Sequence, residues 1–469
     1  MKNILGISTS LRNKRFSYKN SLVDEIKKIK NLKELDLFIK NQIKITFKDI
    51  FNANKNLDFE EKYKELKKYK GNRGLSNSEA SLVYALWQAY QEKKIEINYI
   101  SLSNVFENED RDTIRYFKKN FLKCNGLLIS GPVYFGDRGS LTQRMIEFIN
   151  SDKQCMAHAE KIIFGGLAVG AKRNGGQETT LIFQILDFLS MNSKVIGNGH
   201  DTTAQYGGTL VAGDIGKVSD DTYGIKTALS TGKNMAQTLN KINFNKNSRI
   251  KIKRKIKCNV FILQDNKKKE CYNVVKKLIQ NKSNKDIEFK IFRVFEEKIH
   301  KCIACDVCPI SYGSNEEYRC IIKNKDDFFK KNHKEIIDCD SFIFAAYSGT
   351  NFINVRSNYQ QFIERTRYLR RDNYLFGNKI VTSLIISEVN SNRNLHIRML
   401  TSLLRHNNIL SKPIHIFKNE NKYINFENSE NFFNNFCKTL KNFKKTSINS
   451  EYKPVGYEIS LSKYLEKKK

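Results

Sequence analysis

Four cysteines lie close together in the stretch KCIACDVCPISYGSNEEYRC, residues 301–320. Cys302, Cys305 and Cys308 have two residues between neighbours, and eleven residues separate Cys308 from Cys320. Evenly spaced thiols are typical ligands of an iron–sulfur cluster, whereas a four-cysteine zinc site more often uses two C-x2-C pairs. The spacing therefore favours a 4Fe-4S cluster at these four residues, with zinc as the first alternative and unligated thiols as the second.

The remaining cysteines lie singly, and we expect them to be core thiols: Cys124, Cys155, Cys258, Cys271, Cys339 and Cys437. Ten cysteines in a chain of 469 residues favour metal binding in a reducing compartment over a disulfide framework. The amino-terminal MKNILGISTS is too brief for a signal peptide, and no apolar run is long enough to span a bilayer. These features predict a cytoplasmic protein with no membrane span.

The net charge is +33, from 82 basic and 49 acidic residues. The lysines are spread along the whole chain, and no RNA-binding, zinc-finger or basic-zipper signature accompanies them. The charge therefore predicts a basic surface that attracts anionic cofactors, and no specific nucleic-acid partner.

The elements that must position the cysteines occur twice. Residues 124–149 and 339–366 each read as a cysteine, a turn, a buried strand, a loop and an amphipathic helix. The next strands, 161–170 and 379–388, also match, and a polar loop and a helix follow each of them. Continuous apolar strands separated by helices are typical of parallel sheets buried on both faces. We therefore predict an α/β chain with two tandem, doubly wound parallel-sheet domains.

Composition suggests where these domains begin and end. The polar, basic stretch NKINFNKNSRIKIKRK, residues 240–255, is expected to be a linker. It separates a first domain at residues 1–242 from a second at residues 256–418. Residues 419–469 show no strand pattern and are predicted to form a short, helical carboxyl-terminal extension.

The first predicted strand, residues 3–8, is followed by the hydroxyl-rich loop GISTSLR. Small hydroxyl residues after a strand can wrap a phosphate. A helix with a capping box at Ser76 and Glu79 begins only later and leads directly into a strand at residues 95–102. We therefore interpret residues 13–75 as a helical insertion inside the phosphate loop, because connections from helix to strand are usually short. The competing interpretation makes FSYKNSLVDEI the first helix, with Ser17 and Asn20 in the site.

Two further loops carry glycine and aromatic residues after predicted strands, where ligands of open α/β sheets bind. GPVYFGDRGS offers an aromatic pair that can stack on a planar ring, and VGAKRNGGQETT lets the backbone approach a flat ligand. The later QYGGT repeats the aromatic–glycine theme. The candidate residues are Pro132, Val133, Tyr134, Phe135 and Gly136 in the first of these loops; Gly170, Ala171, Lys172, Gly175, Gly176 and Gln177 in the second; and Tyr206 and Gly207 in the third.

These three loops, in this order, resemble the flavodoxin-like family of NADPH-dependent FMN reductases and iron–sulfur flavoproteins. The resemblance covers residues 1–240 apart from the insertion, with Gly131 where the family usually has a serine. It implies that FMN is the cofactor and that its isoalloxazine ring lies between the second and third loops. By the same resemblance, the FMN phosphate would lie at Ser8, Ser10, Arg12, Ser76, Asn77 and Ser78.

The second half lacks these loops. Lys267 to Lys269 follow its first strand, and Arg393 and Asn394 stand where Gly175 and Gly176 stand in the first half. We therefore predict one FMN per chain. In the resembling family a cysteine motif follows the second strand of the sheet, and here the cysteines follow the strand at residues 287–295. The family's fourth cysteine comes after a shorter gap, so the distant Cys320 departs from the pattern.

The resemblance implies an FMN-dependent NAD(P)H oxidoreductase in which electrons pass between nicotinamide, FMN and the 4Fe-4S cluster. The chain has no G-x-G-x-x-G fingerprint, so NAD(P)H is expected to dock transiently as a co-substrate. Two alternatives stay open, a non-catalytic electron carrier and a redox-sensing scaffold for a partner enzyme. We expect a homo-oligomer with a small-molecule or protein electron acceptor.

Overall fold

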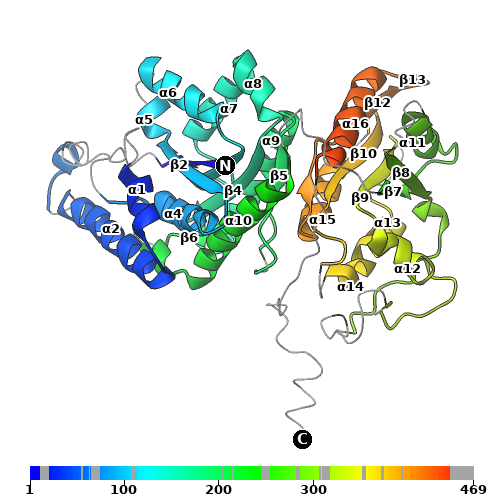
Figure 1. Cartoon of the computed structure of the whole chain (residues 1–469), viewed down its shortest axis with the longest axis horizontal. Coiled ribbons are helices and arrows are strands. Elements are labelled where there is room, and N and C mark those ends of the chain that lie inside the picture. Colours follow the sequence, from blue (N-terminus) through cyan, green and yellow to red (C-terminus); the bar gives the residue numbers. More distant parts are fainter. Residues whose placement is uncertain are drawn as a thin grey trace, which may run out of the picture. The chain divides into compact units, whose positions relative to one another are not determined.

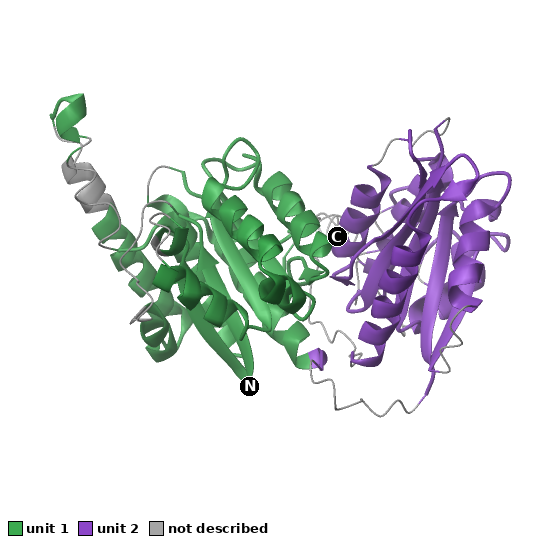
Figure 2. Cartoon of the chain, turned by 90° about the horizontal axis from the view of Figure 1, so that it is seen from above, with its two compact units in different colours: residues 1–240 green, residues 241–469 purple. Residues whose placement is uncertain are grey.

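The computed structural model describes residues 1–10, 21–53, 56–62, 64, 74–106, 111–202, 204–213, 216–243, 254–280, 286–305, 308, 317–318, 320–350, 355–370, 374–391 and 394–443. The chain divides into two compact units, residues 1–240 and 241–469 (Figure 2). No helix among the described residues is long and apolar enough to cross a membrane.

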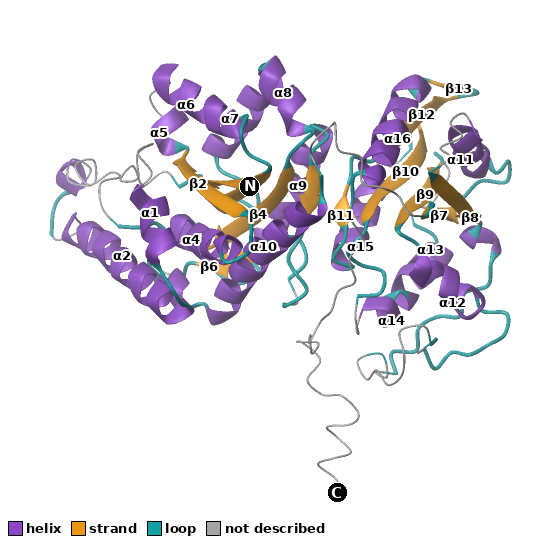
Figure 3. Cartoon of the chain, viewed as in Figure 1, coloured by secondary structure: helices purple, strands orange, loops and turns teal. Residues whose placement is uncertain are grey.

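The first unit is built on a parallel sheet, whose strands are orange in Figure 3. Its strand order is β2-β1-β3-β4, with both β5 and β6 paired to β4. This is the flavodoxin order, and the carboxyl ends of all its strands meet at one edge. The strands are β1 (Lys2–Ser8), β2 (Ile95–Ser101), β3 (Gly126–Pro132), β4 (Ile163–Gly170), β5 (Lys194–Ile196) and β6 (Gly208–Val211).

Helices cover both faces of this sheet (Figure 1). On one face a Cβ at Gly6 would contact Leu86 of α4, and one at Gly165 would contact Met235 of α10. On the other face a Cβ at Gly166 would contact Leu181 of α9. The helices are α1 (Ser21–Lys28), α2 (Leu32–Ala53), α4 (Asn77–Tyr90), α5 (Ser103–Phe106), α6 (Arg111–Phe121), α7 (Ser140–Ser151), α8 (Lys153–Ala159), α9 (Gln177–Ser190) and α10 (Thr222–Lys241), with a 3₁₀ turn η1 at Lys217–Asp220.

Helix α4 begins where its capping box predicts. The Ser76 hydroxyl accepts a hydrogen bond from Glu79 N at 3.3 Å, and the Glu79 carboxylate accepts one from Ser76 N at 2.8 Å. The helix packs on β1, β2, β3 and β4, as the helix that follows the first strand of a βαβ unit must. Helices α1 and α2 precede it and pack against it, which agrees with the interpretation of this region as an insertion. Ser17 and Asn20 of the competing interpretation, and Arg12, lie outside the described residues.

The second unit repeats the topology of the first. Its parallel strands run in the order β8-β7-β9-β10, with both β11 and β12 paired to β10. The fifth strand is interrupted in each unit, between β5 and β6 and again between β11 and β12, which supports a duplicated fold. The strands are β7 (Ile256–Gln264), β8 (Ile287–Phe292), β9 (Ser341–Ser348), β10 (Ile380–Glu388), β11 (Ile409–Leu410), β12 (Ile414–Asn419) and the antiparallel β13 (Lys422–Tyr423).

The predicted carboxyl-terminal extension is in part integral to the second sheet. Phe433, Phe436 and Leu440 of α16 are buried, and this helix packs on β12 and β10. The sequence showed no strand pattern here because β13 has only two residues. The helices of this unit are α11 (Glu270–Gln280), α12 (Phe328–Asp338), α13 (Ser357–Arg365), α14 (Arg367–Arg370), α15 (Leu395–Arg405) and α16 (Phe426–Lys441), with a 3₁₀ turn η2 at Val294–Glu296.

Candidate functional site

A cavity of about 490 Å³ lies at the carboxyl edge of the first sheet. It is the place where open α/β sheets bind ligands. Of the residues predicted from the sequence, eight line it: Ser10, Ser76, Asn77, Ser78, Pro132, Val133, Tyr134 and Ala171. Sequence reasoning missed Thr46, Leu75, Val169, Ala212, Gly213 and Gly216, which also line it.

The amino terminus of α4 gives the cavity its polar wall. Asn77 and Ser78 stand in the first turn, where backbone N–H groups have no partner within the helix. The Asn77 Oδ1 atom is buried and has no hydrogen-bond partner among the described residues. A carboxamide can turn to present its NH₂ group instead, and the Ser76 hydroxyl can donate its own proton while it accepts from Glu79. This wall therefore fits an anionic, phosphate-like group.

Gly131 is explained by its neighbour Thr9. Any Cβ at position 131 would collide with Thr9 Oγ1, which is buried beside it. A serine at position 131 could not coexist with the threonine in this conformation. Gly131 therefore leaves room for the Thr9 side chain, which follows β1.

The loop after β3 closes in a tight turn. Tyr134 N donates to Asp137 O at 2.8 Å, and Asp137 N donates back to Tyr134 O at 2.9 Å. Phe135 and Gly136 between them have φ values of 51° and 77°. This turn places Tyr134 against the cavity, while the Phe135 side chain is fully exposed. The two aromatic residues therefore do not form the pair that we expected, because the turn points them in different directions.

The loop after β4 approaches the second loop through glycine. Gly176 is the N-cap of α9 with a φ of 96°, and a Cβ there would lie 2.7 Å from Gly136 Cα. Gln177 does not face a ligand as predicted, since its Nε2 donates to Lys172 O at 2.8 Å and to Leu210 O at 3.2 Å. It is buried and braces the loop instead. Six of the predicted residues lie in or beside these loops but do not line the cavity: Ser8, Gly170, Lys172, Gly175, Gly176 and Gln177.

Tyr206 and Gly207 are not brought to the cavity. They precede β6, and Gly208 pairs with Leu167 in the middle of β4. Residues that follow a parallel strand lie at the ligand edge, and here Ala212 and Gly213, after β6, line the cavity. Recognising Gly208–Val211 as a strand would have identified these residues from the sequence.

The insertion also contributes to the cavity. Thr46 of α2 lines it, and its hydroxyl donates to Leu75 O at 2.9 Å. Leu75 N donates to Gln42 O at 3.3 Å, and a Cβ at Gly74 (φ 67°) would collide with the same helix. The insertion is therefore tied to the residues that lead into α4.

One half-buried ion pair joins the second loop to α9. Arg138 Nη2 lies 2.9 Å from Asp187 Oδ2, although the geometry is not that of a hydrogen bond, and Arg138 also pairs with Asp137. Burial raises the pKa of Asp187 to about 6; the neighbouring Asp137 adds to this rise and Arg138 opposes it. The loop is thus held by a carboxyl group that titrates near neutral pH.

At the carboxyl edge of the second sheet, an acidic side chain of the protein occupies the position that corresponds to the phosphate position of the first unit. The Asp265 carboxylate, after β7, accepts hydrogen bonds from the backbone N–H groups of Asn266, Cys271 and Tyr272 at 2.8–3.0 Å. The last two belong to the first turn of α11. A carboxylate therefore stands where a phosphate would meet the helix amino terminus. Asp265 is 4% exposed.

The other loops of the second unit are closed by charged side chains as well. Glu388, at the end of β10, accepts hydrogen bonds from Thr350 N and Oγ1 at 2.7 and 2.8 Å, and from the Tyr347 hydroxyl at 2.5 Å. Lys418 and Glu270 form an ion pair at 2.7 Å with side chains only 10% and 12% exposed. Glu388 occupies the position that aligns with Gly170. Arg393 lies outside the described residues, and Asn394 is the N-cap of α15.

The predicted metal ligands lie between η2 and α12. Cys302, Cys305 and Cys308 are half-buried, and Cys320 is buried. Four reduced thiols are chemically suitable for iron or zinc. Among the described residues, however, no three cysteine, histidine or carboxylate side chains are grouped closely enough to hold a metal ion. The four thiols are therefore the right chemical type of ligand for iron or zinc. Several residues between these cysteines lie outside the described ranges.

The six single cysteines are all buried, as expected of core thiols. Burial raises the pKa of the Cys155 thiol to about 12, with Asp152 adding to the rise. Burial likewise raises the pKa values of Cys124, Cys258 and Cys271. These thiols stay protonated at neutral pH and are poor metal ligands.

No family model matches this chain. An iron–sulfur flavoprotein of Methanocaldococcus jannaschii is 31% identical over 172 residues, which cover 34% of this chain and 88% of that protein. A second iron–sulfur flavoprotein of the same organism is 27% identical over 182 residues, covering 34% and 89%.

Solved structures offer only weak likeness. One described as a flavone reductase has 14% identity and a TM-score of 0.29, covering 51% of this chain and 63% of that one. An NADH:FMN oxidoreductase in its apo form has 10% identity and a TM-score of 0.28, covering 50% and 87%. TM-scores this low do not establish a shared fold for the whole chain.

Proposed function

This chain belongs to the iron–sulfur flavoprotein family, and we propose that it is an FMN-dependent NAD(P)H oxidoreductase that carries a 4Fe-4S cluster. The observation that carries the proposal is the cavity at the carboxyl edge of the first sheet. It combines a helix amino terminus, serine hydroxyls and an unpartnered buried carboxamide, which together suit a phosphate.

Four residues would hold the FMN phosphate: Ser10, Ser76, Asn77 and Ser78. Arg12 and Ser8 are further candidates for the same role, the first outside the described residues and the second buried at the end of β1. Tyr134, Val133 and Ala171 would contact the ring, since they belong to the second and third loops and line the cavity. When bound, FMN supplies the ability to accept a hydride and to release electrons singly. The protein's part is to bind, orient and partly shield it.

The cluster would be held by Cys302, Cys305, Cys308 and Cys320, and when bound it supplies one-electron transfer. Zinc at the same thiols is the structural alternative. Because all ten cysteines of the chain are free, we propose a reducing compartment, the cytoplasm. NAD(P)H would dock only transiently, with a small molecule or a protein as the final acceptor.

We further propose that each chain carries one FMN. In the second unit the Asp265 carboxylate already accepts from the amides that would bind a phosphate. Glu388 and the Glu270–Lys418 pair occupy the loops that would face a ring. A flavin there would have to displace buried, paired charges, which is costly.

The test is the absorption spectrum of anaerobically purified full-length chain, before and after dithionite, with flavin, iron and sulfide counted per chain. We expect one FMN, and iron and sulfide each approaching four per chain, as a 4Fe-4S cluster requires. One zinc without sulfide would replace the cluster by a structural site, and two FMN per chain would contradict the division between the units.

The purified chain should also oxidise NADH or NADPH in steady state. Reduction of the flavin only after addition of a partner protein would favour the electron carrier instead. A chain that shows neither behaviour while holding its cofactors would favour the redox-sensing scaffold.

A further inference from the structure

One buried arginine contacts both ends of the cysteine segment. Arg365, the last residue of α13, has a side chain that is 1% exposed. Its Nη1 donates to His300 O at 2.6 Å, and its Nη2 donates to the Tyr318 hydroxyl at 2.5 Å. His300 lies two residues before Cys302, and Tyr318 lies two residues before Cys320. A single guanidinium therefore holds together the chain positions that lead into the first and fourth cysteines.

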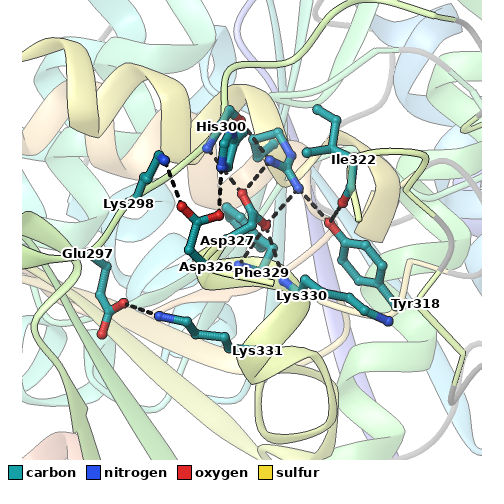
Figure 4. A network of polar contacts seen from close by, with 11 residues as sticks. Glu297, Lys298, His300, Tyr318, Ile322, Asp326, Asp327, Phe329, Lys330 and Lys331 are labelled. Atoms are coloured by element: carbon teal, nitrogen blue, oxygen red, sulfur yellow. Dashed lines mark hydrogen bonds and ion pairs between the residues drawn. The ribbon is translucent and has the colours of Figure 1, made fainter. Parts of the chain in front are cut away.

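The guanidinium itself is fixed by a carboxylate. Asp327 is fully buried and accepts from Arg365 Nη1 at 2.8 Å and from Nη2 at 3.0 Å. The same carboxylate accepts from His300 N at 3.0 Å and caps α12 by accepting from Phe329 N and Lys330 N at 3.1 Å each. Figure 4 shows this network around Asp327, with His300 and Tyr318 on two sides of it. This bidentate pair between Arg365 and Asp327 requires the planar guanidinium group of arginine, which lysine lacks.

Tyr318 is a firm second anchor. Its hydroxyl donates to Ile322 O at 2.9 Å while it accepts from Arg365. Its ring packs edge-on against Tyr368 and His333, with centroids 5.3 and 5.5 Å apart. The hydrogen bonds of its hydroxyl and the two ring contacts thus fix Tyr318, which lies two residues before Cys320.

A purely structural role would require only the pair between α13 and α12. Asp327 already accepts from three backbone N–H groups without the arginine. Beyond Asp327, the two bonds of Arg365 both go to residues that flank the cysteines. Its Nε is also buried and has no hydrogen-bond partner among the described residues. These bonds serve the cysteine segment rather than the packing of the two helices.

We propose that Arg365 is a positioning residue for the metal group at Cys302, Cys305, Cys308 and Cys320. It joins the chain positions that lead into Cys302 and Cys320, and so limits how far the two ends of the segment can separate. This inference rests on the proposed function, because it assumes that these cysteines hold a metal group.

The test compares full-length variants. Arg365→Lys keeps the charge but loses the planar guanidinium group, and the double variant Arg365→Met with Asp327→Asn removes both charges together, which spares the fold an unpaired buried charge. The matched control is Arg254→Lys. Arg254 makes a similar two-pronged pair with Asp340, at 2.9 and 2.8 Å, in the same unit and away from the cysteines.

Two readouts use the loaded protein. Loss of iron to a ferrous chelator should be on the order of tenfold faster in both Arg365 variants than in wild type or control, as for other residues that orient metal ligands. Flavin content should not change, which shows that the first unit is intact.

A third readout needs no metal. Cys320 is only 8% exposed, so iodoacetamide should alkylate it slowly in the metal-free full-length chain and faster in both Arg365 variants. If the Arg365 variants bind iron and show the same rates of alkylation and iron loss as wild type, the proposed role of Arg365 is wrong, while the proposed cluster is not contradicted. The wild-type protein could contain no metal while the Arg365 variants are still alkylated faster than wild type. That result would contradict the cluster but support the role of Arg365 in holding the segment. If zinc is found, the same comparison applies to the rate of zinc loss.

Discussion

The two units share one strand order and differ at the edge where their strands end. In the first unit this edge has small residues, serine hydroxyls and an unpartnered carboxamide around a cavity. In the second unit, Asp265 occupies the helix amino terminus, and Glu388 stands at the position of Gly170. The comparison teaches that the fold supplies the location of a site, whereas the loop residues decide whether a ligand or the protein itself fills it.

The charges at this edge of the second unit are paired within the protein. Lys418 and Glu270 form an ion pair, and Glu388 accepts hydrogen bonds from Tyr347 of β9 and from Thr350, which follows that strand. The first unit leaves donors and acceptors for something else to satisfy, which costs stability until a ligand binds. The second unit has, in addition, the arginine-anchored segment that carries the cysteines.

The largest expected effect comes from placing a side chain on Gly176. Gly176→Val forces a β-branched residue into φ 96° and pushes a Cβ to within 2.7 Å of Gly136 Cα. Strain of about 1–3 kcal/mol at such a position should weaken FMN binding by about fivefold to 150-fold. Flavin bound per chain, measured by absorbance after gel filtration, checks this expectation.

The matched control lies at the equivalent position of the second unit. Asn394 is also the N-cap of its helix but has a negative φ of −90°, so valine there avoids the left-handed strain that it meets at Gly176. Asn394→Val should leave flavin content unchanged. If both variants lost flavin equally, the proposed difference between the units would be wrong.

A smaller effect is expected from the charges that fill the second unit. Lys418→Met leaves the Glu270 carboxylate without its ammonium partner in a site about one-tenth exposed and should lower the free energy of unfolding by about 3 kcal/mol. Adding Glu270→Gln should recover most of this loss. As a control, Lys290→Met breaks the exposed pair with Glu335 and should cost less than about 1 kcal/mol.

Urea unfolding followed by circular dichroism measures these changes. Trp87, the single tryptophan, belongs to the first unit, so its fluorescence transition should not move. A loss of stability in Lys290→Met as large as that in Lys418→Met would show that the buried pair has no special weight.

The smallest effect concerns Asp187. Its pKa is about 6 in the folded protein and 3.8 ordinarily, so the folded state keeps a proton that the unfolded state has lost between these values. This group's contribution to stability therefore declines as pH rises from about 4 to about 6. The melting temperature of Asp187→Asn minus that of wild type should therefore be larger at about pH 7 than at about pH 5. A melting difference independent of pH would contradict the raised pKa.

Much of the fold could be predicted from the sequence. The apolar strands, the capping box at Ser76 and the repeated strand–loop–helix pattern are local signals, and each appears where it was expected. The single cysteines are buried because they lie in or beside apolar elements. The cavity residues that follow β1 and β3 were found because a strand end is legible in the sequence.

The errors have a common cause. Tyr206 and Gly207 were expected at the site, but they lie on the wrong side of a four-residue strand that the sequence did not reveal. Gln177 was expected to face the ligand, yet its hydrogen bonds go to Lys172 and Leu210. The direction of a side chain depends on backbone angles and on partners distant in the sequence, which local patterns do not contain.

The sequence by itself determined that this chain has two parallel-sheet halves, one with a cysteine segment and one with small-residue loops, because periodicity and spacing are local properties. Only the tertiary structure decided that Thr46 of the insertion lines the cavity and that Asp265 fills the equivalent place in the second unit. It alone brought Arg365 to both His300 and Tyr318. Such contacts join residues far apart in the chain, and packing creates them only when the sheets and helices have assembled.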